Sequence, residues 1–298
     1  MKKKLYLFKE RYPIILSIFI TILWMAVFRI AGIIFGNIPR IYESTNEYIL
    51  QIITDFIATI FGIFLIVFFG YKKIFKEKRY GKGKTIVTGL YLIIMSIIVI
   101  LSYLYLYTIS IVFPELLSEI YVITYSVQPL NKIVFFIITM ILVGTAEEFT
   151  FRGLIANVIF DKYGKSSKGV WFSTFMTGTI FGSIHLFNAV YPEISFHSAL
   201  VQAIGASVLG MVLTAIYYRT RDIWFLVFLH AFNNFAALFG TGILGAGTID
   251  SAIGSYSYVN LIAIIPYVIV LLVLLRKSKM EEILEGTHSL TLDDNFSL

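Results

Sequence analysis

Eight apolar segments, each long enough to cross a lipid bilayer, dominate this chain of 298 residues. A bilayer core is about 30 Å thick, so a helix of about 20 apolar residues spans it. Because 58% of the residues are hydrophobic and only 14% are charged, a soluble fold would lack the polar surface to cover its core. The sequence therefore predicts an all-α, polytopic bundle of about eight transmembrane helices, over residues 13–36, 48–71, 85–113, 131–160, 169–190, 197–218, 222–240 and 256–275.

The basic residues fall mainly on one side of such a bundle. The N-terminal stretch, the loops after the second, fourth and sixth segments, and the stretch after the eighth together hold 20 of the 24 Lys and Arg residues. Because cytoplasmic loops of membrane proteins carry an excess of Lys and Arg, this asymmetry predicts that both termini are cytoplasmic. We therefore expect a multi-pass protein of the cell membrane, and we attribute its net charge of +6 to topology and not to nucleic-acid binding.

The same pattern predicts one domain and a short tail. We expect residues 1–279 to form a single transmembrane domain, and residues 280–298 to form an acidic cytoplasmic tail that is loosely held and has no assigned function. The chain has no cysteine, which excludes disulfides, thiolate metal ligands and a cysteine nucleophile.

Few ionisable side chains lie inside the apolar segments, where a charge at the bilayer centre costs about 2.5–3.5 kcal/mol. Arg29 lies near the outer end of the first segment, and Asp55 lies near the outer start of the second. We expect the two side chains at similar depth and predict that they form a structural ion pair.

The fourth segment carries a denser group, formed by Glu147, Glu148 and Arg152. Glu148 and Arg152 are four residues apart, so a helix places them on one face, where they neutralise each other. Glu147 points about 100° away and has no such partner in its own helix. A buried carboxylate without a partner can take up a proton, which is what a general base requires. We therefore expect Glu147 to carry the chemistry of a site.

Two histidines and an amide lie in later segments, His185 in the fifth and His230 with Asn234 in the seventh. His230 and Asn234 are four residues apart and share a helix face. A lone histidine in a membrane helix more often bonds two helices together than catalyses a reaction. With a helical rise of about 1.5 Å per residue, however, all three residues and Glu147 are compatible with one layer of the bundle. We therefore predict that they form one hydrolytic site.

The residues leave two chemistries open for this site. In the first, Glu147 and a histidine activate a water molecule for attack on a peptide carbonyl, while His230 and Asn234 donate hydrogen bonds to the oxyanion. In the second, Glu147, His185 and His230 hold a divalent metal such as zinc, because two imidazoles and a carboxylate form a known catalytic set. The HExxH and GxSxG patterns of other hydrolases are absent from the chain.

Three motifs on successive apolar helices resemble those of a known family. The family is CPBP, which comprises the CAAX proteases and the bacteriocin-processing enzymes and is also called Abi. The resemblance covers about residues 130–240, and its motifs are Glu147-Glu148-x-x-x-Arg152, Phe181-x-x-x-His185 and His230-x-x-x-Asn234.

This resemblance implies an eight-helix fold and an intramembrane endopeptidase of the glutamate type or the metallo type, with a cavity open to the cytoplasm. It also implies that Glu147 is the catalytic acid and base and that His185 partners it on the water. His230 and Asn234 would stabilise the oxyanion, or His185 and His230 would ligate a metal. Glu148 and its arginine would support the site.

Composition guides the expected biological role. A short chain rich in Lys and Ile, with a lysine-dense N-terminus, is typical of bacteria, where prenylated CAAX substrates are not expected. We therefore expect a peptide or membrane-protein substrate, processed in bacteriocin maturation or self-immunity at the bacterial cytoplasmic membrane. Two alternatives are a non-catalytic immunity or scaffolding protein that binds a toxin or sensor, and a transporter with a proton relay, which no visible repeat supports.

Overall fold

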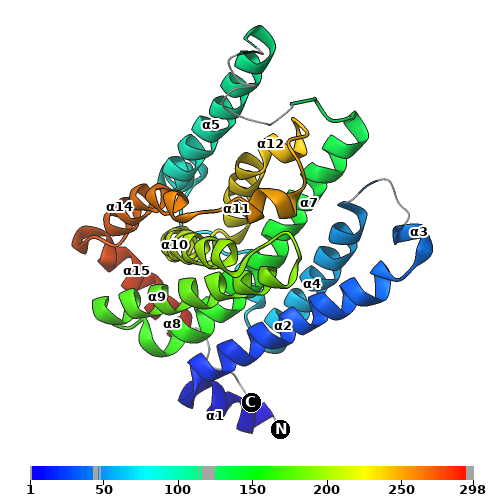
Figure 1. Ribbon diagram of the computed structural model, residues 1–298. Coiled ribbons are helices and arrows are strands. Elements are labelled where there is room, and N and C mark those ends of the chain that lie inside the picture. The colour runs from blue at the N-terminus through cyan, green and yellow to red at the C-terminus, as the bar shows by residue number, and fades with distance from the viewer. Residues whose placement is uncertain (1, 43–45, 47, 114, 116–124, 293–298) are drawn as a thin grey trace.

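The computed structural model describes residues 2–42, 46, 48–113, 115 and 125–292 of the chain. Over these residues the chain forms helices and no strands, which confirms the predicted all-α class (Figure 1). The elements are α1 (Lys2–Arg11), α2 (Pro13–Gly36), α3 (Pro39–Tyr42), α4 (Tyr48–Phe68), η1 (Lys72–Phe75), α5 (Lys82–Val112), α7 (Leu130–Glu148), η2 (Phe149–Ala156), α8 (Asn157–Tyr163), α9 (Ser167–Ser183), η3 (Ile184–Val190), α10 (Phe196–Thr220), α11 (Ile223–Ala237), α12 (Phe239–Gly242), α13 (Ile249–Gly254), η4 (Tyr258–Ala263), α14 (Ile264–Leu274) and α15 (Lys277–Leu292).

All eight predicted apolar segments coincide with helices. By length and composition, five of the described helices could cross a membrane: α2, α4, α5, the continuous run from α7 to α8, and α10. A sixth span arises if η4 with α14 is joined to α15 across a bend of 67°. Helices α9 and α11, with 17 and 15 residues, are shorter than a full span. A membrane bundle is therefore supported, while the count of eight stays a prediction.

The outward faces of the long helices are apolar. Phe19 on α2 is 60% exposed, and Val87 and Tyr105 on α5 are 68% and 65% exposed. Large hydrophobic side chains on the outside of a bundle are stable in contact with lipid tails and unfavourable in water. The structure is therefore that of a protein whose surroundings are a bilayer.

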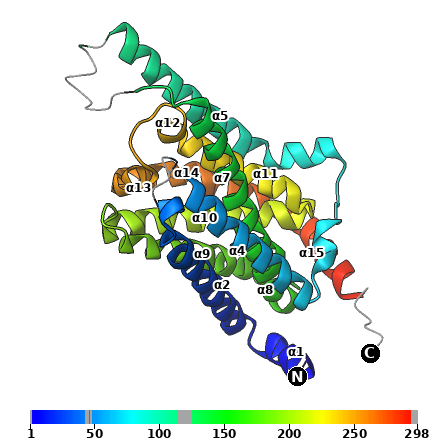
Figure 2. The ribbon, with the colours of Figure 1, turned by 90° about the vertical axis from the view of Figure 1, so that its right-hand side faces the viewer.

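The basic segments gather at one end of the bundle. Lys9 of α1 forms an ion pair of 3.0 Å with Asp161 of α8, which joins the N-terminal stretch to the loop after the fourth segment. Arg221, after α10, forms an ion pair of 2.8 Å with Glu77, which lies after α4. Figure 2 shows α1, α8 and α15 toward this end, with α12 and α13 toward the other. The charge asymmetry read from the sequence therefore corresponds to one physical end, which we predict is cytoplasmic.

The segment after residue 279 is packed and not loose at its start. Helix α15 continues to Leu292, and the side chains of Met280 and Ile283 are buried in the main core. Glu282 forms ion pairs with Arg219 (3.4 Å) and Lys279 (2.8 Å). The expected loose tail is therefore wrong for residues 280–284, because their apolar side chains cover the ends of α8, α9 and α10.

The centre of the bundle is the end of the fourth predicted segment. Helix α7 passes directly into a π-helical stretch, η2, and then into α8. All eight residues of η2 are buried. Helices α4, α9, α10 and α11 pack around α7 and η2. The acidic motif therefore lies in the buried core of the bundle.

Candidate active site

The fourth-segment helix changes geometry within the acidic motif. Glu148 is the last residue of α7, and the π-helical turns of η2 follow at once. A π-helix widens the turn, leaves carbonyls displaced from their usual partners and occurs frequently at functional sites. Here the side-chain amide of Asn157 donates to the carbonyls of Arg152 (3.1 Å) and Gly153 (2.9 Å). Asn157 therefore stabilises the displaced backbone beside the motif.

Glu148 and Arg152 form the predicted ion pair. Arg152 Nη1 donates to Glu148 Oε1 at 2.7 Å, and both side chains are fully buried. Arg152 Nη2 donates to the Gly210 carbonyl of α10 at 3.1 Å, and the guanidinium lies 4.5 Å over the Phe181 ring of α9. The prediction of this pair is confirmed, and the pair also ties η2 to two neighbouring helices.

His230 contacts both glutamates of the motif. Its Nδ1 lies 2.7 Å from Glu148 Oε1, and its Nε2 lies 3.3 Å from Glu147 Oε2. The imidazole is 3% exposed, while the Glu147 side chain is 13% exposed. Glu147, which has no partner in its own helix, therefore has His230 of α11 as its partner.

A glycine allows α11 to approach this closely. Gly144 lies one turn before the glutamates, and a Cβ atom there would lie 3.0 Å from the Ala231 backbone nitrogen and 3.2 Å from the Val227 carbonyl oxygen. Small residues let transmembrane helices pack backbone to backbone. The contact between His230 and the glutamates therefore depends on the missing side chain at position 144.

His185 lies in the 3₁₀ segment η3, which follows α9. Its ring packs edge-on against Phe181 at 5.4 Å, and Phe181 packs in the same way against His230 at 5.7 Å. Its buried Nδ1 faces the carbonyls of Phe181 and Gly182 without closing a regular hydrogen bond. His185 makes no ion pair with Glu147, so the partnership implied by the resemblance would need a bridging molecule.

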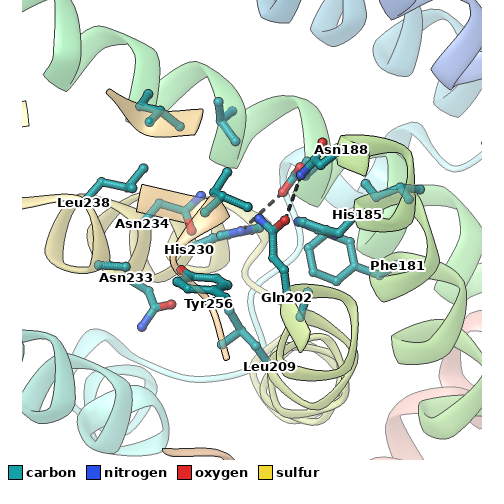
Figure 3. A pocket seen from close by; sticks show the side chains of 18 of the residues that line it. Phe181, His185, Asn188, Gln202, Leu209, His230, Asn233, Asn234, Leu238 and Tyr256 are labelled. Carbon is teal, nitrogen blue, oxygen red and sulfur yellow. Dashed lines mark hydrogen bonds and ion pairs between the residues drawn. The ribbon is translucent and has the colours of Figure 1, made fainter. Parts of the chain in front are cut away.

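Four of the six predicted site residues line one cavity of about 500 Å³. Glu147, His185, His230 and Asn234 line it, and Figure 3 shows the last three converging on it from η3 and α11. Glu148 and Arg152 do not line the cavity. The fold therefore brings the predicted site residues together. Only the four that line the cavity can contact a ligand bound in it.

The cavity extends away from the basic end. Its lining continues from the site to Arg29, Tyr191 and Asp250, at the opposite end of the helices, and includes no residue of the basic loops. The resemblance implied a cavity open to the cytoplasm. If the basic end is cytoplasmic, as predicted, the described cavity instead extends toward the other side.

The proposed metal ligands do not fit a metal centre in the described residues. No group of three or more His, Asp and Glu side chains there comes together in a way that could hold a metal ion. Both ring nitrogens of His230 lie against carboxylate oxygens. Protein side chains and water are therefore the groups available for the chemistry.

The predicted ion pair between Arg29 and Asp55 is wrong. Arg29 donates to the Tyr191 hydroxyl at 3.1 Å and to the Phe187 carbonyl at 3.0 Å. Asp55 accepts from the Gln51 side chain at 3.0 Å. Similar depth on two helices does not fix the direction in which side chains point, and here both helices turn these groups to different neighbours.

Two supporting residues were not identified from the sequence. Gly144 precedes the acidic pair by one turn, and Asn157 follows Arg152 by five residues. The five-residue spacing matches the i to i+5 bonding of a π-helix, which is the only signal the sequence holds for Asn157.

The comparisons with known proteins agree with the motifs. Residues 129–236 match the model of the family described as type II CAAX prenyl endopeptidase Rce1-like. This segment contains all six predicted site residues. A search of curated proteins finds no match to the chain. The family match confirms the resemblance to CPBP over residues 129–236.

Proposed function

We propose that the protein is a CAAX-type intramembrane endopeptidase in which Glu147 activates water. The observation that carries this proposal is the position of Glu147. It is the one carboxylate of the motif that lines the cavity, and His230 holds it at 3.3 Å. A carboxylate in a low-dielectric cavity with an adjacent imidazole has the surroundings that general base catalysis needs.

The proposed reaction uses one water molecule for each peptide bond. Glu147 takes a proton from the water, and the water oxygen attacks the carbonyl carbon to form a tetrahedral intermediate. The carbon–nitrogen bond then breaks, and the proton on Glu147 passes to the leaving nitrogen. One carboxylate thus serves first as base and then as acid, and it ends each cycle unprotonated.

The remaining residues receive roles from their contacts. His230 bridges the two carboxylates, so we assign it to orienting Glu147 and not to the oxyanion that the resemblance implied. His185 and Asn234 line the cavity without an ion pair to either glutamate, and their side chains can donate to the water or the oxyanion. Glu148 and Arg152 position His230.

The biological role that we propose is peptide maturation or self-immunity. It rests on the bacterial character of the sequence, and the family match supports the class of reaction on which it depends. A non-catalytic immunity or scaffolding protein would need no water-activating carboxylate. Replacement of Glu147 therefore separates the two proposals.

The test compares Glu147→Gln with Glu281→Gln in purified protein reconstituted into liposomes. Glu281 is an exposed carboxylate of α15 at the basic end. With a pool of fluorogenic apolar peptides, we expect Glu147→Gln to lower cleavage by at least about 10²-fold, as removal of a general base does, and Glu281→Gln to leave it unchanged. Full cleavage by Glu147→Gln would overturn the proposal.

A further inference from the structure

Arg29 is a cation in the cavity wall without an anionic partner. Its guanidinium donates to the Tyr191 hydroxyl and the Phe187 carbonyl, and it lies 5.0 Å from the centre of the Tyr191 ring. No carboxylate of the described residues lies within ion-pair distance of it, and Asp55, its expected partner, accepts instead from Gln51. The positive charge is therefore held by neutral groups alone.

Such an arrangement has a free-energy cost inside a membrane protein. Arg29 lies seven residues before the end of α2, about 10 Å below it at the helical rise. Charged side chains at membrane depth pair or mark the path of a ligand. An arginine carries five N–H donors, and the two neutral acceptors use two of them. Donors and charge therefore remain for a further group.

The other charges of the cavity leave this place open to an anion. Among the residues described as lining it, Arg29 is the one Lys or Arg. Glu147 is held by His230, and Asp55 by Gln51. Burial and the neighbouring Glu193 raise the pKa of the Asp250 carboxyl, which weakens its competition for the guanidinium.

Arg29 also contacts the segment that carries His185. Its acceptor Phe187 lies in η3, two residues after His185. A group bound at Arg29 would therefore contact the segment that carries one of the cavity-lining histidines. The planar fork of an arginine matches both oxygens of a carboxylate, which a lysine does not.

We propose that Arg29 determines substrate specificity by binding a carboxylate of the peptide substrate, either its C-terminus or an acidic side chain. The inference rests on the proposed endopeptidase function and names the polar end of the same cavity. The peptide would lie with this anion at Arg29 and with its scissile bond beside Glu147.

The experiment measures binding and cleavage of three acetylated apolar octapeptides in nanodisc-embedded protein. One has a free C-terminal carboxylate, one is the amide, and one is an amide with an acidic last side chain. Calorimetry with the Glu147→Gln protein avoids turnover. We expect the free acid or the acidic amide to bind at least about tenfold more tightly than the neutral amide, as a charge-assisted bidentate pair allows.

Variants assign this preference to Arg29. In Arg29→Gln the acid and amide should bind alike, Arg29→Lys should keep part of the difference, and Lys132→Gln should keep all of it. Lys132 is a cation of α7 that does not line the cavity. Equal loss of acid and amide binding in Arg29→Gln would show that Arg29 only holds η3 in place, and it would overturn the inference.

The failure of this inference is distinguishable from failure of the proposed function. If wild-type protein cleaves the peptides and cleavage requires Glu147, but all three peptides show the same KM, the inference is wrong and the endopeptidase stands. If Glu147→Gln cleaves as fast as wild type, the proposed function is wrong, and the inference that rests on it is overturned with it.

Discussion

His230 Nδ1 lies 2.7 Å from Glu148 Oε1, the oxygen that also accepts from Arg152. A line of contacts therefore runs from Arg152 through Glu148 and His230 to Glu147, whose carboxylate faces the cavity. The first two members are fully buried and do not reach the cavity. We therefore propose that Glu148 positions His230 and that Glu147 carries out the reaction.

Replacement of each glutamate by glutamine should separate these roles. Glu148→Gln leaves the buried Arg152 without its counter-charge, and breaking a buried pair in this way costs about 3–5 kcal/mol. We expect it to lower both the thermal unfolding midpoint and kcat. Glu147→Gln should lower kcat and leave the midpoint within about a degree, because Glu147 is partly exposed. Differential scanning fluorimetry and steady-state kinetics measure the two effects, and equal midpoints would contradict the assignment.

A methyl group at position 144 should damage the site more than the fold. In Gly144→Ala the new Cβ lies 3.0 Å from the Ala231 backbone nitrogen, so α11 must move and take His230 with it. We expect kcat to fall severalfold, because the neighbour must shift by a few tenths of an ångström and a misplacement of about 1 Å costs up to about 10²-fold. The matched control is Gly83→Ala, where nothing lies within 4 Å of the new atom. Unchanged kcat in Gly144→Ala would show that the close approach is dispensable.

Loss of the Asn157 amide should destabilise the π-helical turn. Asn157→Leu keeps the volume but leaves the carbonyls of Arg152 and Gly153 without their donors, and each buried group left unsatisfied costs about 1–3 kcal/mol. The hydroxyl of Tyr218, which donates to Asn157 at 2.9 Å, also loses its acceptor. We expect a lower unfolding midpoint in detergent, with Tyr218→Phe as a milder comparison. A midpoint equal to wild type would refute this role.

The fold was predictable because the bilayer imposes few alternatives. Apolar length located every described helix that could cross a membrane, and contacts such as Arg221 with Glu77 place the basic segments at one end. The break in geometry at η2 was not predictable, since its residues would also form an ordinary helix. Burial of Met280 and Ile283 was missed because charged neighbours in the sequence masked two apolar positions.

The site was predictable as a set of residues but not as a set of contacts. Four-residue spacing identified the Glu148–Arg152 pair, because both partners lie on one helix. Spacing within a helix holds no information about which residue of another helix lies opposite. That is why the sequence could not show that His230 contacts both glutamates, and why Arg29 was paired with the wrong neighbour.

Cleavage should be independent of added or removed metal. The predicted ligands do not gather as a metal-binding set, and both nitrogens of His230 already face carboxylates. We expect 1,10-phenanthroline to change Glu147-dependent cleavage by less than about twofold, with a zinc protease as the positive control for chelation. Elemental analysis should give well below one metal ion per protein. Stoichiometric zinc with loss of activity on chelation would overturn this expectation.

The side toward which the cavity extends should differ from the side of the basic loops. The chain has no cysteine, so single cysteines can be introduced without background labelling. Ser255 is exposed beyond α13, at the end toward which the cavity runs, and Glu281 is exposed at the basic end. Because basic loops are retained in the cytoplasm, a membrane-impermeant maleimide added to intact cells should label Ser255→Cys and not Glu281→Cys. Both variants should label after the membrane is permeabilised, which controls for accessibility of each thiol. The reverse pattern in intact cells would place the cavity on the cytoplasmic side, as the resemblance to the family implied, and would show that the basic loops do not set the orientation of this chain.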